Sequence, residues 1–229
     1  MAEIVSLRGR FATTIVIELI ASISGLGLIV FVLGHLAGNF LLFLGPDQFN
    51  AYAAHLKALG PVLSLMRTVM LTALILHAGM TVWLKLRNMG ARGGRYAVTT
   101  RAASRSIGTR TMIYTGIIIF LFLFLHVYDF AFADKAGARS LIHGTSLGLY
   151  GIVFNSFANP VRSALYVAAV WAVGFHFSHV LSSLWVTLGA LNDRLTGGID
   201  GVARLFGVLL ALGYTSIPVF VLIKTFLFT

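Results

Sequence analysis

The 229-residue sequence contains no cysteine and few charged residues. Without cysteine, the chain can form neither a disulfide nor a thiolate metal site, and it has no thiol nucleophile. Charged residues make up 10% of the chain and hydrophobic residues 58%, whereas in soluble domains about a quarter of the residues are charged. This composition excludes an ordinary soluble domain and indicates an integral membrane protein.

Acidic residues are also scarce, because seven Asp and Glu stand against 17 Lys and Arg, for a net charge of +10. Such a charge can indicate nucleic-acid binding, but most of it lies in one segment between apolar runs. The basic residues of that segment are Lys85, Arg87, Arg92, Arg95, Arg101, Arg105 and Arg110, with no acid among them. Basic loops stay in the cytoplasm, so the charge indicates topology and predicts no nucleic-acid partner.

Five apolar runs are long enough to cross a bilayer, which takes about 20 residues. We predict an all-α fold, a single membrane domain (1–229) whose helices span residues 18–44, 62–86, 111–130, 161–185 and 202–228. The first run is too long for a signal peptide and lacks its cleavage site. With Arg8 and Arg10 near the amino terminus, the predicted path has a cytoplasmic N-terminus and an external C-terminus.

Histidines lie inside four of the five runs: His35, His77, His126 and His176, with His179 as a second one in the fourth run. An ionisable side chain inside a span is costly and rarely faces lipid. It marks a functional site or hydrogen-bonds a neighbouring helix. Because successive helices alternate in direction, we expect His35 and His126 in the outer half of the membrane. His77 and either His176 or His179 are expected in the inner half, roughly 10 Å or more away.

Two imidazoles that face each other from neighbouring helices are the axial ligand set of a b-type haem. The sequence therefore predicts that four of the helices enclose two stacked haems, each with one histidine on either side of its iron. Glycines beside the histidines would leave room for a flat macrocycle: Gly34, Gly38, Gly79 and Gly174. Zinc would need three or four ligands at one point. A proton relay would add buried carboxylates. Only Glu18 is counted inside a span, because Asp129, at the end of the third run, is assigned to the loop that follows.

Polar residues near the helix ends offer two places for a quinone. The inner candidates are Glu18, Ser22 and Ser24, and the outer ones are Asn39, Asn50, Tyr52 and His55. Polar side chains at such positions also cap helices or bond neighbouring ones. His143 lies in an outer loop, where we expect a solvated role.

Several segments together resemble a known family. They are "FVLGHLAGNF", "DQFNAYAAHL", "LILHAGMTVWL", "FLFLHVYDF" and "GFHFSHVLSSLWVTLG", in this order along nearly the whole chain. They resemble the five-helix, di-haem cytochrome b that anchors bacterial succinate:menaquinone oxidoreductase (succinate dehydrogenase). The resemblance implies that His77 and His176 hold the inner haem iron and His35 and His126 the outer one. It favours His176 over His179.

The resemblance also implies partners and a location. An iron–sulfur subunit and a flavoprotein carrying FAD would dock on the cytoplasmic face of a bacterial inner membrane, and electrons would pass to a quinone, menaquinone in this family. The chain would then be the membrane subunit of an enzyme whose succinate site lies elsewhere. Some relatives that act as fumarate reductases carry an acid near the first loop, where this sequence has Lys57 and Arg67.

Three alternatives remain open at the level of sequence. The same architecture could run in reverse, as the anchor of a quinol:fumarate reductase. It could be another di-haem membrane cytochrome, or a transporter with structural histidines, although substrate sites of transporters favour broken helices. For the di-haem reading, the basic second loop predicts the higher reduction potential for the inner haem.

Overall fold

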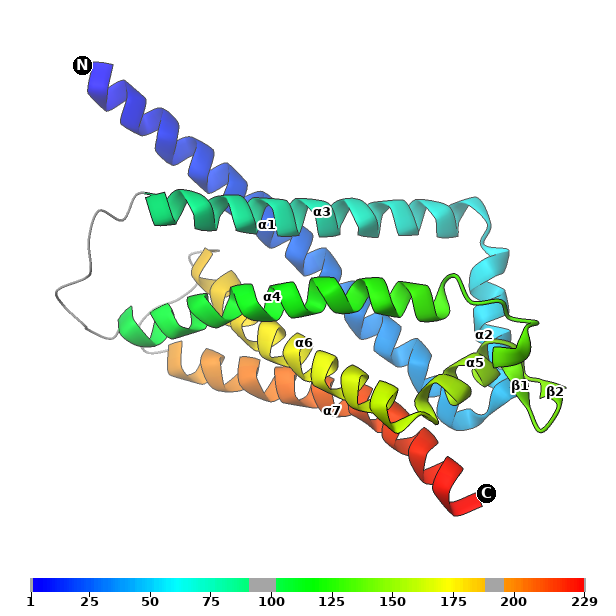
Figure 1. The fold of residues 1–229 in the computed structure, drawn as a ribbon. Helices are drawn as coiled ribbons and strands as arrows, with labels where there is room; N and C mark the ends of the chain where they lie inside the picture. Colours follow the sequence, from blue (N-terminus) through cyan, green and yellow to red (C-terminus); the bar gives the residue numbers. More distant parts are fainter. Residues whose placement is uncertain (1, 91–101, 188–195, 229) are drawn as a thin grey trace.

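The computed structural model describes residues 2–90, 102–187 and 196–228, and side chains within 14–90, 111–181 and 198–227. The elements along the chain are α1 (Ala2–Phe40), η1 (Leu41–Leu44), α2 (Pro46–Ala58), α3 (Pro61–Gly90), α4 (Ala102–Phe130), η2 (Ala138–Ser140), β1 (Leu141–Ile142), β2 (Thr145–Ser146), α5 (Gly148–Phe157), α6 (Pro160–Thr187) and α7 (Thr196–Phe228) (Figure 1).

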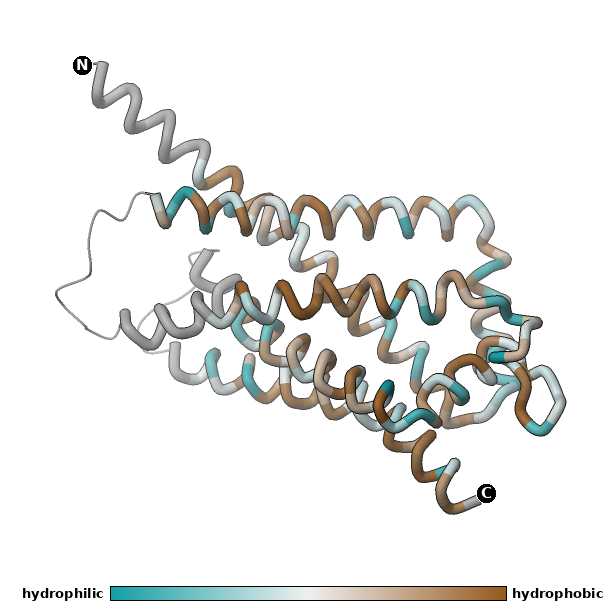
Figure 2. Tube along the Cα trace, viewed as in Figure 1, coloured by the Kyte–Doolittle hydropathy of each residue, from teal (hydrophilic) through white to brown (hydrophobic). Residues whose placement is uncertain are grey.

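Within the described residues, five helices are long and apolar enough to cross a membrane, which confirms the predicted number. Their candidate spans are Thr14–Leu44, Pro61–Gly90, Thr111–Phe130, Pro160–Leu181 and Gly198–Leu227. Hydrophobic residues run along the middle of these helices, and hydrophilic residues gather around α2 and the small β-hairpin (Figure 2). The helices α1 and α4 begin well before their apolar runs, because the run marks only the part that fits the lipid core.

Successive long helices alternate in direction, so the two termini lie at opposite ends of the bundle (Figure 1). The short elements α2, α5 and β1–β2 gather at one end, which we call the hairpin end. The other end is called the N-terminal end. Of the basic residues that predict the topology, Arg92, Arg95 and Arg101 lie outside the described residues.

The five long helices do not pack equally. The closest contact is between α6 and α7, where Gly174 and Gly207 face each other so tightly that a Cβ on either would meet the carbonyl of the other. Small residues commonly allow such close approach in membranes. The helix α3 packs chiefly on α1, and α4 chiefly on α6.

The hairpin end holds a compact apolar cluster. Its buried members are Leu42, Phe49, Val153, Phe157, Tyr166, Ile217 and Val221. Phe49 comes from α2 and Phe157 from α5, so the segments between the spans supply part of this core. The sequence indicates an amphipathic stretch in 45–61, which becomes α2. It gives no sign of α5 or of the hairpin within 129–160.

Candidate functional site

Four histidines from four helices meet as two pairs. His35 on α1 and His126 on α4 have ring centroids 5.7 Å apart, with the ring planes at 89°. His77 on α3 and His176 on α6 have centroids 6.3 Å apart, with the planes at 82°. The structure therefore brings together the pairs that the sequence predicts, and His176 is the partner of His77. A role for them as metal ligands stays a prediction.

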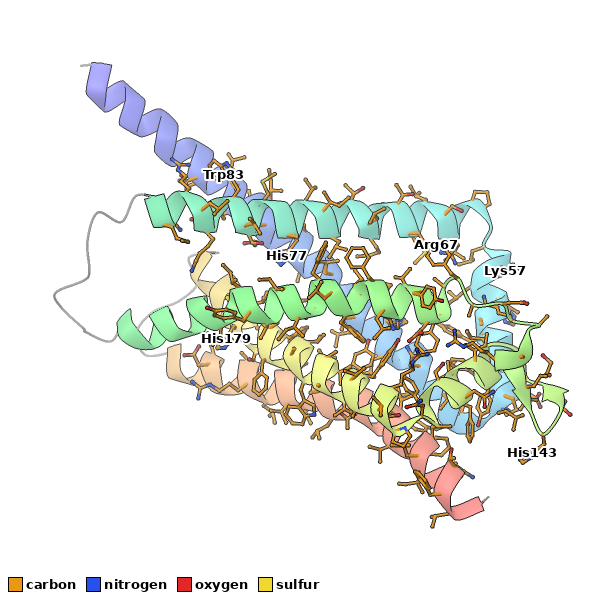
Figure 3. The ribbon with its side chains drawn as sticks, in the orientation of Figure 1. Lys57, Arg67, His77, Trp83, His143 and His179 are labelled. Carbon is orange, nitrogen blue, oxygen red and sulfur yellow. The ribbon has the colours of Figure 1, made fainter. Side chains whose placement is uncertain are left out.

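The two pairs lie at different levels of the bundle. His77 and His176 each follow the first residue of their helix by sixteen positions, and both helices start at the hairpin end. His35 and His126 lie within five residues of the last residue of helices that finish at that end. At about 1.5 Å per residue, the levels differ by about 15 Å along the helices. Figure 3 labels His77 on α3, between Arg67 near the hairpin end and Trp83 near the other.

In the His77–His176 pair, one ring nitrogen of each histidine has a hydrogen-bond partner. His77 Nδ1 lies 3.0 Å from the carbonyl oxygen of Ala21 on α1. Because a carbonyl only accepts, Nδ1 carries the hydrogen and Nε2 keeps a free lone pair. His176 Nδ1 lies 3.0 Å from the hydroxyl of Thr115 on α4. Gly25 allows the first contact, since a Cβ there would lie 2.9 Å from His77 Nδ1.

The His35–His126 pair has a different surrounding, made mainly of aromatic rings. Phe31 stacks on His35 at 5.5 Å, and the ring of Tyr214 lies 6.3 Å from it. Three more rings contact His126: Phe122, Phe130 and Tyr166. His126 Nδ1 is buried and has no hydrogen-bond partner. These imidazoles are therefore held by ring packing, whereas those of the other pair are also hydrogen-bonded.

A buried carboxylate lies one turn beyond His126 on α4. Asp129 is fully buried, accepts a hydrogen bond of 2.8 Å from Tyr166 Oη, and lies 3.0 Å from the Arg162 guanidinium. The Arg139 guanidinium lies 3.8 Å from the same carboxylate and donates to Ser156 Oγ at 2.8 Å. Sequence reasoning took Asp129 for a loop acid. Asp129 lies on the last turn of an apolar run, and arginines occur in the loop that follows (Arg139) and at the start of the next span (Arg162). This pattern is the signal that could have revealed the cluster.

The glycines beside the histidines have different surroundings. A Cβ at Gly34 or at Gly79 would meet nothing within 4 Å. Gly38 instead makes room for the ring of Tyr52, and Gly174 for the close packing of α6 on α7. The prediction that Gly38 and Gly174 leave space beside a ligand is therefore wrong, because protein groups fill both spaces.

The inner quinone candidates do not gather at one place. Ser24 is buried, and its hydroxyl donates to backbone carbonyls of its own helix, at 2.6 Å to Ile20 and 3.1 Å to Ala21. Glu18 is exposed. At 100° per residue, Glu18 and Ser22 share one side of α1 and Ser24 lies on another.

The outer quinone candidates make hydrogen bonds or packing contacts with other parts of the protein. Asn50 joins α2 to α5, since its amide donates to the Leu147 carbonyl at 2.9 Å and accepts from the Tyr150 N–H at 3.1 Å. Asn39 donates to the His35 carbonyl at 2.7 Å. His55 is exposed and bonds its own helix. Tyr52 is the one that packs on Gly38.

Of the remaining residues singled out in the sequence, His143, Lys57 and Arg67 are exposed and His179 is partly buried. His143 is exposed at the tip of the β1–β2 hairpin, and Lys57 and Arg67 lie toward the same end (Figure 3). Both of these cations are exposed. His179 lies one turn beyond His176 on α6, nearer the N-terminal end (Figure 3).

In the part of the chain that the structure describes, no group of three or more His, Cys, Asp or Glu side chains is placed to hold a metal ion, so the imidazoles come in twos. Comparisons of the chain with protein-family models, with curated proteins and with solved structures found no match.

Proposed function

We propose that the chain is a di-haem cytochrome b that anchors a succinate:quinone oxidoreductase in the membrane. His35 with His126, and His77 with His176, would supply the axial ligands of two b-type haems. The observation that carries the proposal is the meeting of imidazoles from alternate helices, pair by pair, at two levels. A single buried histidine would need no explanation beyond a hydrogen bond to a neighbouring helix.

The separation within each pair suits one iron between two rings. A bond from an imidazole nitrogen to a metal is about 2 Å, and that nitrogen lies about 1 Å from the ring centroid. Two axial imidazoles on one iron therefore have centroids about 6 Å apart. The observed separations are 5.7 Å and 6.3 Å.

The protonation state of the rings also favours this role. A histidine that binds a metal commonly donates its other N–H to a backbone or side-chain acceptor, which fixes the ring and makes it a better ligand. His77 has such an acceptor in the Ala21 carbonyl. His126 Nδ1 is buried and has no such acceptor, so this argument applies to the His77–His176 pair.

When bound, the haem irons would accept and pass on one electron at a time. The chain's own residues hold the two pairs apart along the bundle and orient the imidazoles, and aromatic side chains surround the His35–His126 pair. The potential at each level depends on ligation, burial and nearby charge. Two such levels would allow electrons to cross much of the membrane.

The partners follow from what the sequence lacks and from the family resemblance. The chain has no flavin-binding, nucleotide-binding or succinate-binding signature. Oxidation of succinate is therefore assigned to a flavoprotein subunit, linked through an iron–sulfur subunit docked on the cytoplasmic face, and a quinone receives the electrons. Neither predicted quinone set gathers into a site, so the proposal names no quinone residue.

Reduced-minus-oxidised spectra of the purified full-length chain, with a haem-to-protein ratio, test the proposal. We expect a ratio of two after expression with a haem supply, whereas a colourless protein would overturn it and favour the transporter. Isolation from its native membrane separates the remaining possibilities. A flavin-containing partner supports the oxidoreductase, and the relative rates of succinate oxidation and fumarate reduction distinguish the two directions.

A further inference from the structure

We infer that Thr115 is the positioning residue of the His77–His176 centre: its hydroxyl holds His176 in the tautomer and orientation that leave Nε2 available to iron. The inference rests on the proposed function. It assigns a role to a residue that is not itself a haem ligand. Its contact is direct, because Thr115 Oγ1 lies 3.0 Å from His176 Nδ1, between α4 and α6.

The hydrogen-bond pattern of Thr115 favours one direction for this bond. A hydroxyl has one hydrogen to donate and two lone pairs to accept with. Thr115 Oγ1 also lies 3.0 Å from the Thr111 carbonyl and 3.1 Å from the Met112 carbonyl, both in the preceding turn of α4. If its hydrogen goes to these carbonyls, the hydroxyl accepts from His176 Nδ1–H. Nε2 then carries no hydrogen.

The same arrangement occurs on the other side of the pair with a different acceptor. His77 Nδ1 meets the backbone carbonyl of Ala21, which no substitution of a side chain removes. Each imidazole of this pair is thus oriented through Nδ1 from a neighbouring helix, α1 for His77 and α4 for His176. Of these two hydrogen-bond partners, the Thr115 hydroxyl is the one that a side-chain substitution can remove without changing either histidine.

Removal of the hydroxyl has a predictable electronic effect. A hydrogen bond from Nδ1–H increases the basicity of the ligand, which favours the more positively charged ferric state. Thr115→Val keeps the branched shape and removes the hydroxyl, while the backbone hydrogen bond between His176 and Met112 stays in place. The potential of the haem held by His77 and His176 should therefore rise. We expect a change of up to about tenfold in the reduction equilibrium, equivalent to 59 mV for a one-electron couple.

The test is a redox titration of the full-length protein followed in the visible spectrum, with the low-spin electron paramagnetic resonance signals recorded alongside. Thr115→Ser keeps a hydroxyl and should restore the wild-type potential. Thr68→Val is the matched control, because Thr68 is an exposed threonine of α3 whose hydroxyl bonds the Ser64 carbonyl of its own helix. This control should leave both potentials unchanged.

The outcomes separate clearly. A raised potential of one haem in Thr115→Val, or loss of that haem alone, supports the inference when Thr115→Ser resembles the wild type. Identical titrations of Thr115→Val and wild type overturn it while the proposed function stands. Equal shifts in the valine and serine variants also overturn it, because the hydroxyl would then not be the cause. A wild-type chain without haem overturns the proposed function and this inference with it.

Discussion

Two levels of the bundle hold similar pairs of histidines in different ways. Near the hairpin end, the His35–His126 pair is surrounded by aromatic rings and adjoins the fully buried Asp129 with its two arginines. Towards the N-terminal end, His77 comes from α3, a helix of 30 residues without a single buried side chain among those described. Hydrogen bonds from α1 and α4 orient that pair.

The difference indicates that the imidazoles of the two pairs are held in place in two different ways. At the hairpin end, α2, α5 and the hairpin close over the long helices, so the scaffold itself fixes the imidazoles. At the other level, α3 touches chiefly α1, and individual polar contacts fix the rings. We therefore expect the His77–His176 centre to respond to changes of single atoms near the ligands. The His35–His126 centre should respond to changes that loosen the surrounding fold.

The largest effect should come from removing one of the proposed haem ligands. His176→Leu takes away one of two axial nitrogens, so one haem should be lost and the haem-to-protein ratio should fall by half while the other haem keeps its spectrum. His126→Leu should do the converse. The ratio is measured on the purified chain from the haem absorbance and the protein concentration.

His179→Leu is the control for that experiment, because His179 lies one turn away on the same helix and should leave the ratio unchanged. If His176→Leu kept two haems and His179→Leu lost one, the assignment of the pair would be wrong. Loss of both haems in either ligand variant would contradict the independence of the two levels.

The next effect concerns stability at the hairpin end. Asp129→Asn removes the charge that two guanidiniums face, and breaking a buried ion pair by removing one partner is destabilising. Because the Arg162 and Arg139 side chains are 34% and 41% exposed, we expect a loss of about 1–3 kcal/mol. It should appear as a lower melting temperature of the full chain in detergent.

Asp134→Asn is the matched control, since Asp134 is exposed and makes no ion pair among the described residues. An Asp129→Asn protein that melts with the wild type would mean that the cluster contributes nothing to stability. If the packed fold at the hairpin end fixes the imidazoles of His35 and His126, the haem that they hold should also be the one lost first when this variant is heated.

A smaller and more local effect is expected at Gly25. A Cβ there would lie 2.9 Å from His77 Nδ1 and 3.0 Å from its Cε1, so Gly25→Ala must shift the ring away from the Ala21 carbonyl. We expect about a tenfold weaker retention of one haem, measured by the transfer of haem to excess apomyoglobin.

Gly27→Ala provides the comparison on the same helix, because a Cβ at Gly27 meets nothing within 4 Å. It should retain haem as the wild type does. Equal retention in the two alanine variants would show that the His77 ring has room to move, and that the hydrogen bond to Ala21 does not hold it.

Much of the bundle could be predicted from the sequence because its signals are local. Hydropathy along the chain gives the five spans, and alternation of direction gives the level of each histidine. The pairing of His35 with His126, and of His77 with either His176 or His179, follows from these two facts. Depth does not separate His176 from His179, which are one turn apart. The resemblance favoured His176, and the structure places His176 against His77.

The features that were missed depend on contacts between distant segments. Asp129 reads as a loop acid until Arg139, Arg162 and Tyr166 are seen around it. Gly174 lies two residues before His176 in the sequence, yet it serves the contact between α6 and α7. Glycine spacing along one helix says nothing about which neighbouring helix approaches it, so it could not distinguish a space for a ligand from a packing contact.

The smallest expected effect tests whether the hairpin is scaffold alone. His143 has a positive φ of 49° in the two-residue turn between β1 and β2, a backbone conformation that costs a non-glycine residue roughly 1 kcal/mol. His143→Gly should therefore raise the stability slightly, by less than about 1 kcal/mol or roughly 2–4 °C in melting temperature. The visible spectrum should not change, because His143 is exposed at the hairpin tip. His55→Gly makes the same exchange inside α2, where glycine costs about 0.5–1 kcal/mol, so its melting temperature should fall. Changes of opposite sign in the melting temperatures of the two variants would assign the effect at His143 to its backbone. A lower melting temperature in both variants, or a changed spectrum in His143→Gly, would mean that the imidazole at the hairpin tip makes a contact that matters.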